Sequence, residues 1–128
     1  MRRLKDEIAA AALGPLTRPA PATAARRFRF GPEFGGFGGH FPDLPILPAI
    51  VEILAAVTVA EAAVDRPLTL VGVRQGRFLI KVAPNQEIAV QCREHDGADP
   101  GCWAVKIMFG KDVAATFVLA FAAAGEQA

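Results

Sequence analysis

The chain has few of the residues that mark metal, disulfide and redox sites. Its 128 residues include only two cysteines, Cys92 and Cys102, and two histidines, His40 and His95. The cysteines have no CxxC spacing and the histidines lie 55 positions apart, so the usual zinc-ligand patterns and a disulfide framework are absent. We expect no metal and no cofactor, and two buried, reduced thiols in a cytoplasmic protein.

The sequence also lacks a strong charge excess and a long apolar run. The formal net charge is +1, so no basic footprint of a nucleic-acid-binding protein is present. The longest apolar stretch, residues 49–64, contains Glu52 and Glu61 and is too short for a membrane-spanning helix. Charged residues interrupt the short apolar run near the start, so we expect no signal peptide.

The composition indicates one domain with more apolar surface than a small monomer needs. Hydrophobic residues make up 52% of the chain, which favours burial of some surface in an oligomer. Residues 2–13 predict a short amphipathic helix, and residues 14–24 predict a Pro/Ala linker. We therefore divide the chain into an N-terminal segment (1–24), a folded domain (25–123) and a tail (124–128).

Alternating patterns predict an antiparallel sheet of four to six strands. Over residues 25–30, Phe28 and Phe30 fall on one face and Arg27 and Arg29 on the other, as in a half-buried strand. Residues 68–73 and 76–82 predict either one long strand or two pieces with a bulge near Gly76. The other predicted strands are residues 87–94, 102–109 and 113–123, with turns at 84–85, 96–101 and 110–112.

One predicted helix, residues 48–64, is apolar nearly all round, and such a helix is buried on most sides. Pro48 suits its first position because its fixed φ is already helical. A sheet that curls around one long central helix follows from this pattern. The expected fold class is α+β.

A glycine- and proline-rich loop, residues 38–48, leads into this helix and carries His40. A titratable imidazole, a rigid turn and a helix N-terminus therefore lie close together in the sequence. This combination suits abstraction of a proton next to a carbonyl group.

The loop and the helix resemble the 3-hydroxyacyl-[acyl-carrier-protein] dehydratase family, which has the hot-dog fold. The family loop reads roughly G-H-F-P-x-x-P-x-x-P-G-V. This chain has Gly39-His40-Phe41-Pro42, then Pro45, Pro48, Ala49 and Ile50 at the same spacing. The phenylalanines before the loop resemble members tied to aryl polyene synthesis, and residues 77–84 resemble the family's later strand and turn.

The resemblance implies a set of site residues. His40 matches the base that removes the proton α to the thioester carbonyl, and Ala49 matches a glycine whose backbone N–H binds the carbonyl oxygen. Alanine retains that N–H, which lacks an intrahelical acceptor near the first turn. The implied substrate contacts are Phe37, Gly39, Phe41, Pro48, Leu54 and Thr58.

The chain departs from the family at the helix acid, which is Glu or Asp fourteen residues after the histidine and is Leu54 here. Glu52 is the nearest carboxylate and should face about 200° away around the helix. Three explanations stay open: His40 alone moves the proton, a different hot-dog subunit supplies the acid, or the site binds acyl chains without chemistry. The simpler interpretation of Glu52 is a buried or interface carboxylate paired with an arginine or a backbone donor.

The resemblance also implies partners. A phosphopantetheine arm of an acidic acyl carrier protein, or a coenzyme A thioester, would deliver the substrate, and Arg74, Arg77 and Lys81 would contact the carrier. Together with Arg27 and Arg29 they predict a local basic rim. We expect a homodimer or higher homo-oligomer, or a pair with another hot-dog chain. The alternatives to a dehydratase are a non-catalytic acyl-binding or regulatory subunit and a thioesterase that uses Glu52.

Overall fold

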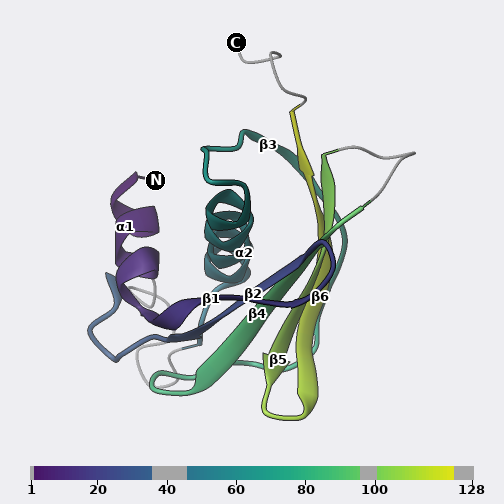
Figure 1. Cartoon of the computed structure of the whole chain (residues 1–128). Helices are drawn as coiled ribbons and strands as arrows, with labels where there is room; N and C mark the ends of the chain where they lie inside the picture. The colour runs from purple at the N-terminus through teal and green to yellow at the C-terminus, as the bar shows by residue number, and fades with distance from the viewer. Residues whose placement is uncertain (1, 36–45, 96–100, 123–128) are drawn as a thin grey trace.

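The fold consists of a curved sheet, one central helix and one covering helix. The computed structural model describes residues 2–35, 46–95 and 101–122. Figure 1 shows the sheet on one side of helix α2 and helix α1 on the other. The helices are α1 (Arg2–Ala10) and α2 (Ala49–Val64). The strands are β1 (Ala12–Ala20), β2 (Thr23–Arg29), β3 (Leu70–Phe78), β4 (Glu87–Glu94), β5 (Cys102–Phe109) and β6 (Asp112–Phe121). The α+β hot-dog class predicted from the sequence is confirmed.

The six strands form one antiparallel sheet in the order β1-β2-β4-β5-β6-β3. Its two edges are therefore β1 and β3, which lie at opposite ends of the sheet. The observed bounds of β4 and β5 match the prediction, and β6 begins one residue earlier than expected. Strand β3 ends at Phe78, short of the predicted residue 82, and α1 ends at Ala10, short of the predicted residue 13. The predicted turn at residues 96–101 lies mostly outside the described residues.

Alternation along the strands places the core between the sheet and α2. Ile88, Val90 and Cys92 of β4 are buried, whereas the residues between them are at least partly exposed. The pairing continues this inner face to Val105 and Phe117 on β5 and β6. Cys92 and Cys102 are both buried and free, and burial raises the pKa of the Cys92 thiol to about 12.

Helix α2 is buried on most sides, as its nearly uniform apolar sequence predicts. Pro48 is the residue before the helix, with φ −66° and ψ 151°, so the helix begins one residue later than predicted. Asp65 ends the helix in the left-handed conformation, and its N–H donates to the Glu61 carbonyl. Neither helix in the described ranges is long and apolar enough to cross a membrane.

The segment predicted to be a Pro/Ala linker, residues 14–24, is not a linker. It contains most of β1 and the start of β2, and its pairing runs from Ala12 opposite Phe28 to Ala20 opposite Thr23, with two register shifts. The prolines in β1 obscure the strand pattern in the sequence. An edge strand tolerates them because one side of its backbone needs no partner in the sheet.

The predicted bulge near Gly76 is confirmed in β3. Arg74 pairs with Val118 and Arg77 with Thr116, so two residues of β3 lie opposite the single residue Phe117. One of these two, Gln75, has φ +55° in the left-handed region. A bulge of this kind bends an edge strand and redirects a side chain.

Candidate active site

The N-terminus of α2 carries two backbone N–H groups without an acceptor among the described residues. The Leu47 N–H donates to the Val82 carbonyl at 2.7 Å and fixes the chain before the helix. The N–H groups of Val51 and Glu52 both donate to the Pro48 carbonyl, at 3.0 and 3.4 Å. Those of Ala49 and Ile50 stay free in this part of the chain, at the positive end of the helix dipole. Ala49 is exposed and Ile50 is 47% exposed, so this end of the helix is accessible.

Four predicted site residues lie outside the described residues: Phe37, Gly39, His40 and Phe41. The base predicted at His40 therefore stays a prediction from sequence. Pro48 and Ala49, which follow this loop, lie at the N-terminus of α2 as expected.

Glu52 is a buried carboxylate in the first turn of α2. It is 4% exposed, and burial raises its pKa from 4.5 to about 7. No hydrogen bond or ion pair of its carboxylate is found among the described residues, so the pairing expected from the sequence is not found there. Glu52 follows Ala49 by three positions, which makes the two residues neighbours on the helix surface. A protonatable carboxyl group thus lies one turn from an N–H that has no acceptor in residues 2–35, 46–95 and 101–122.

Leu54 and Glu52 lie on different sides of α2. Leu54 is 4% exposed and belongs to the core. It precedes Glu61 by two turns on the same face, and Glu61 contacts α1 through Lys5. Glu52 instead precedes Ala56 by one turn, and the Ala56 carbonyl accepts a hydrogen bond from Cys92 Sγ of β4 at 3.5 Å. The leucine therefore faces α1 and the glutamate faces the sheet.

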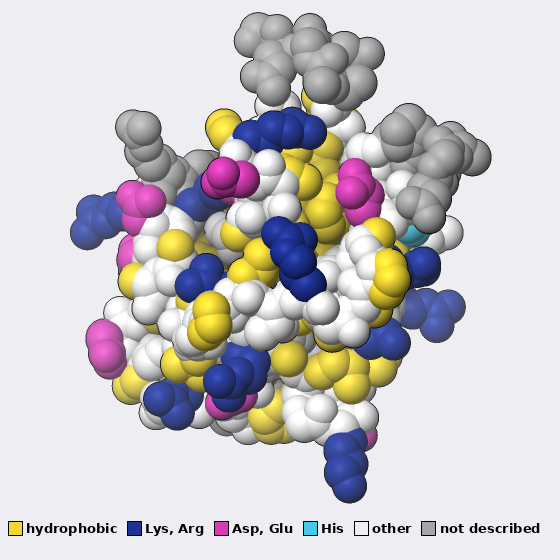
Figure 2. All heavy atoms as spheres, in the orientation of Figure 1, with side chains coloured by type: hydrophobic (Ala, Val, Ile, Leu, Met, Phe, Trp, Pro, Cys, Tyr) yellow, Lys and Arg dark blue, Asp and Glu magenta, His cyan; other side chains and the backbone are white. Residues whose placement is uncertain are grey.

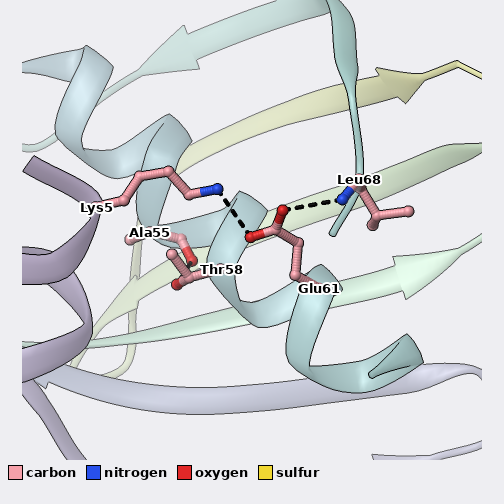
Figure 3. Close-up of polar contacts among 5 residues, drawn as sticks. All are labelled: Lys5, Ala55, Thr58, Glu61 and Leu68. Carbon is pink, nitrogen blue, oxygen red and sulfur yellow. Dashed lines mark hydrogen bonds and ion pairs between the residues drawn. The ribbon is translucent and has the colours of Figure 1, made fainter. Parts of the chain in front are cut away.

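Thr58 is half-buried, and its hydroxyl is already used. Thr58 Oγ1 donates to the Ala55 carbonyl at 2.7 Å. Figure 3 draws both residues beside the ion pair of Lys5 and Glu61. The hydroxyl proton is therefore not available to a substrate in this conformation. Sequence reasoning missed the structural role of Glu61, although an isolated carboxylate in an apolar helix signals that a specific partner is needed.

The three residues predicted to contact a carrier are all exposed: Arg74, Arg77 and Lys81. Arg74 and Arg77 lie on the same face of the sheet, because their partners on β6 are two residues apart. None of the three forms an ion pair with a residue that the structure describes. These side chains are therefore free to meet an acidic partner.

Arg27 and Arg29 do not form the basic rim with Arg74, Arg77 and Lys81 that the sequence predicted. These two arginines are on β2, and three strands separate β2 from β3 in the sheet. Arg27 is also paired with Glu87 at 3.1 Å. In the face shown in Figure 2, Lys and Arg side chains lie dispersed among apolar side chains and do not form one continuous stripe.

The antiparallel sheet curled against a central helix defines a hot-dog protein. A model of the ApeI-like family, described as ApeI dehydratase, matches residues 18–115. The chain therefore belongs to the ApeI-like dehydratase family.

Solved structures with the same fold agree with this assignment. The chain is similar to the dehydratase heterocomplex ApeI:P from Xenorhabdus doucetiae, with a TM-score of 0.75 and 15% identity over 86% of this chain and 95% of that chain. An uncharacterized protein from Erwinia carotovora subsp. atroseptica gives a TM-score of 0.67 and 16% identity over 88% and 94%. The pyran synthase domain from module nine of the sorangicin pathway gives a TM-score of 0.60 and 18% identity, over 91% of this chain and 41% of that chain. No curated protein sequence gives a significant match.

Proposed function

We propose that this protein dehydrates 3-hydroxyacyl thioesters, carried by an acyl carrier protein or coenzyme A, in cytoplasmic fatty acid or polyketide-type biosynthesis. Two groups one helical turn apart carry the proposal: the backbone N–H of Ala49, which has no acceptor among the described residues, and the protonatable carboxyl group of Glu52. Membership of a dehydratase family supports the reaction class.

The proposed reaction needs a base, an oxyanion donor and an acid. His40 removes the proton from C2 while the Ala49 N–H stabilises the negative charge on the thioester oxygen. Such a donor contributes about 3–4 kcal/mol to lowering the barrier. The C3–O bond then breaks, C2 and C3 become doubly bonded, and the leaving hydroxyl takes a proton and departs as water.

Glu52 is the proposed source of that last proton. Its pKa of about 7 keeps a large fraction of the group protonated at neutral pH. Leu54 has no proton to give, and its side chain faces α1 instead. This arrangement adds a fourth explanation to the three left open by the sequence. The acid comes from the same helix, two residues before the family position.

The thioesterase alternative is less well supported. A thioesterase would use Glu52 as an ionised nucleophile or general base, and burial disfavours the ionised form. The acyl-binding alternative differs from the dehydratase in predicting no turnover at all. A product assay distinguishes the three functions: a dehydratase forms an enoyl thioester, a thioesterase releases free thiol, and an acyl-binding protein forms neither.

The β3 edge is the proposed oligomer interface. Val71 and Leu79 are both 64% exposed at this end of the sheet. The other edge, β1, contains Pro15 and Pro19, and prolines protect an edge strand from pairing. An exposed apolar edge favours strand addition by a second copy or by another hot-dog chain, and the similar structure from Xenorhabdus doucetiae is a heterocomplex.

The carrier is proposed to dock near β3 as well. Arg74 and Arg77 project from one face of this strand, and the exposed Lys81 follows it. All three lack an ion-pair partner in the described ranges, so an acidic carrier would meet uncompensated positive charge.

The test follows the enoyl thioester absorbance formed from a 3-hydroxybutyryl thioester, together with release of free thiol. We expect absorbance without thiol release, and a fall of about 10²- to 10⁴-fold in His40→Ala and in Glu52→Gln. Glu94→Gln, at an exposed position on β4, is the matched control and should keep full activity. Release of thiol that depends on Glu52 would instead identify a thioesterase, and full activity in Glu52→Gln would remove Glu52 from the mechanism.

A further inference from the structure

A second site lies on the outer face of the sheet, away from α2. A hollow of about 330 Å³ opens there over strands β4, β5 and β6. Side chains alternate between the two faces of a strand, so Gln91 and Arg93 point away from the face that carries Cys92. The sheet itself therefore separates this hollow from the N-terminus of α2.

Two cations border the hollow without compensation. Arg93 and Lys106 line it, and no acidic residue appears among its described lining residues. Neither cation forms an ion pair within the parts of the chain that the structure describes. Lys106 is paired with Gln91, so Arg93 is its diagonal neighbour, with Cβ atoms about 7–8 Å apart. Both side chains are long enough for their charged groups to contact the same anion.

The floor of the hollow is small and mainly apolar. In the row that starts at Arg93, the next two residues across the sheet are Ala104 and Val118. In the row that starts at Gln91, they are Lys106 and Thr116. The hollow forms because short side chains lie between longer ones. Gln91, Arg93 and Lys106 provide hydrogen-bond donors at its sides. This combination suits a ligand with an anionic end and an apolar body.

The bulge in β3 closes one side of the hollow. Gln75 lines it and takes φ +55°, a conformation that costs free energy for a residue other than glycine. A regular strand would place residue 75 on the opposite face from Arg74, and the bulge changes this alternation. The strained backbone thus brings an amide group to the rim.

We propose that this hollow binds a small phosphate monoester. A phosphate monoester carries about −1.5 to −2 charges at neutral pH, which matches the two uncompensated cations. The guanidinium of Arg93 suits bidentate binding of a phosphate, and Lys106 adds a second positive charge. The apolar part of the ligand lies over Ala104 and Val118.

A second copy of the same face is a poor occupant. A two-fold interface places identical patches against each other, so Arg93 and Lys106 would face their own counterparts. Such like charges repel, and the described lining residues provide no carboxylate to offset them. The proposed dehydratase chemistry lies across the sheet at the N-terminus of α2. The proposed carrier contacts Arg74 and Arg77 share the face of the hollow, because they pair with Val118 and Thr116.

The test is a titration of the full chain followed by amide NMR and calorimetry at constant ionic strength. The probes are phenyl phosphate, inorganic phosphate and benzyl alcohol. We expect saturable binding of phenyl phosphate, with a Kd about tenfold below that of inorganic phosphate and no binding of benzyl alcohol. The shifted amides should lie around the hollow, at residues 75, 91, 106 and 116.

Three substitutions locate the site. Arg93→Gln and Lys106→Gln should each raise the Kd for phenyl phosphate about tenfold, because each removes one charge-assisted contact. Lys111→Gln, in the turn between β5 and β6, is the matched control and should leave the Kd unchanged. Lys106→Arg should restore most of the affinity. Absence of saturable binding, equal binding of the two phosphates, or equal effects of Lys106→Gln and Lys111→Gln would each overturn the proposal.

Discussion

Lys5 Nζ of α1 lies 2.9 Å from Glu61 Oε1 of α2, and the other oxygen of the same carboxylate accepts the Leu68 backbone N–H at 2.9 Å. One side chain therefore joins both helices and the segment that enters β3 (Figure 3). Both residues of the ion pair are partly buried, with side-chain exposures of 33% and 18%. This contact holds α1 over the face of α2 that carries Leu54.

Replacement of Glu61 should separate the two contributions of this carboxylate. Glu61→Ala should lower the free energy of unfolding by about 1–3 kcal/mol, because the Leu68 N–H loses its acceptor. Glu61→Gln retains an acceptor and loses the ion pair, so its cost should stay near about 0.2–1 kcal/mol. Urea denaturation measures both. Glu87→Gln removes the more exposed pair with Arg27 and serves as the control; a Glu61→Ala variant no less stable than this control would refute the role of Glu61.

The buried carboxyl group of Glu52 should make stability depend on pH. Its pKa is about 7 in the folded state and near 4.5 in the unfolded state, so the folded state binds more protons between these values. The free energy of unfolding should then fall as pH rises from about 4.5 to 7, by an amount on the order of 3 kcal/mol, and stay level above that window.

The substitution Glu52→Gln removes this proton linkage. The variant should gain stability relative to the wild type as pH rises from 4.5 to 8, as measured by urea denaturation at each pH. Glu94→Gln, at an exposed site, should follow the wild-type curve. A Glu52→Gln curve parallel to that of the wild type would contradict the raised pKa.

The Ala49 N–H can be deleted while the helix is retained. Proline is favoured at the first position of a helix, and Pro48 already has the extended conformation that a residue before proline requires. Ala49→Pro should therefore fold normally by circular dichroism, yet lower kcat about 10²- to 10³-fold. Ala49→Gly keeps the N–H and is the control, with activity at least equal to that of the wild type. Equal activity in all three proteins would exclude the N–H as the oxyanion donor.

The exposed β3 edge should decide the oligomeric state. Substitution of both Val71 and Leu79 by lysine adds charge to the apolar edge and should convert an oligomer to a monomer in light-scattering measurements. Ala20→Lys, on the opposite edge strand β1, should keep the wild-type mass. A wild-type chain that is already monomeric at all concentrations would show that no copy of itself covers β3, and a different hot-dog chain would then be the partner to test.

Patterns with a short period were readable from the sequence. Ile88, Val90 and Cys92 alternate without interruption, so the bounds of β4 followed from the residues alone. The apolar run of α2 likewise predicted a buried helix, and the Gly-His-Phe-Pro loop before it indicated the dehydratase family. The prolines of β1 concealed a strand, because local sequence does not reveal that a segment will occupy the edge of a sheet, where missing N–H groups are tolerated.

The sequence by itself determined the class of fold, since burial of a uniformly apolar helix leaves few arrangements other than a sheet wrapped around it. Tertiary structure alone decided which charges are paired. Glu52 and Glu61 look alike in the sequence, nine positions apart on one helix. Packing gives Glu61 a lysine and a backbone N–H, and leaves Glu52 buried with no partner in the described part of the chain. The physical reason is that desolvation and pairing depend on which distant segments surround a side chain, and those neighbours are set by the fold rather than by adjacent residues.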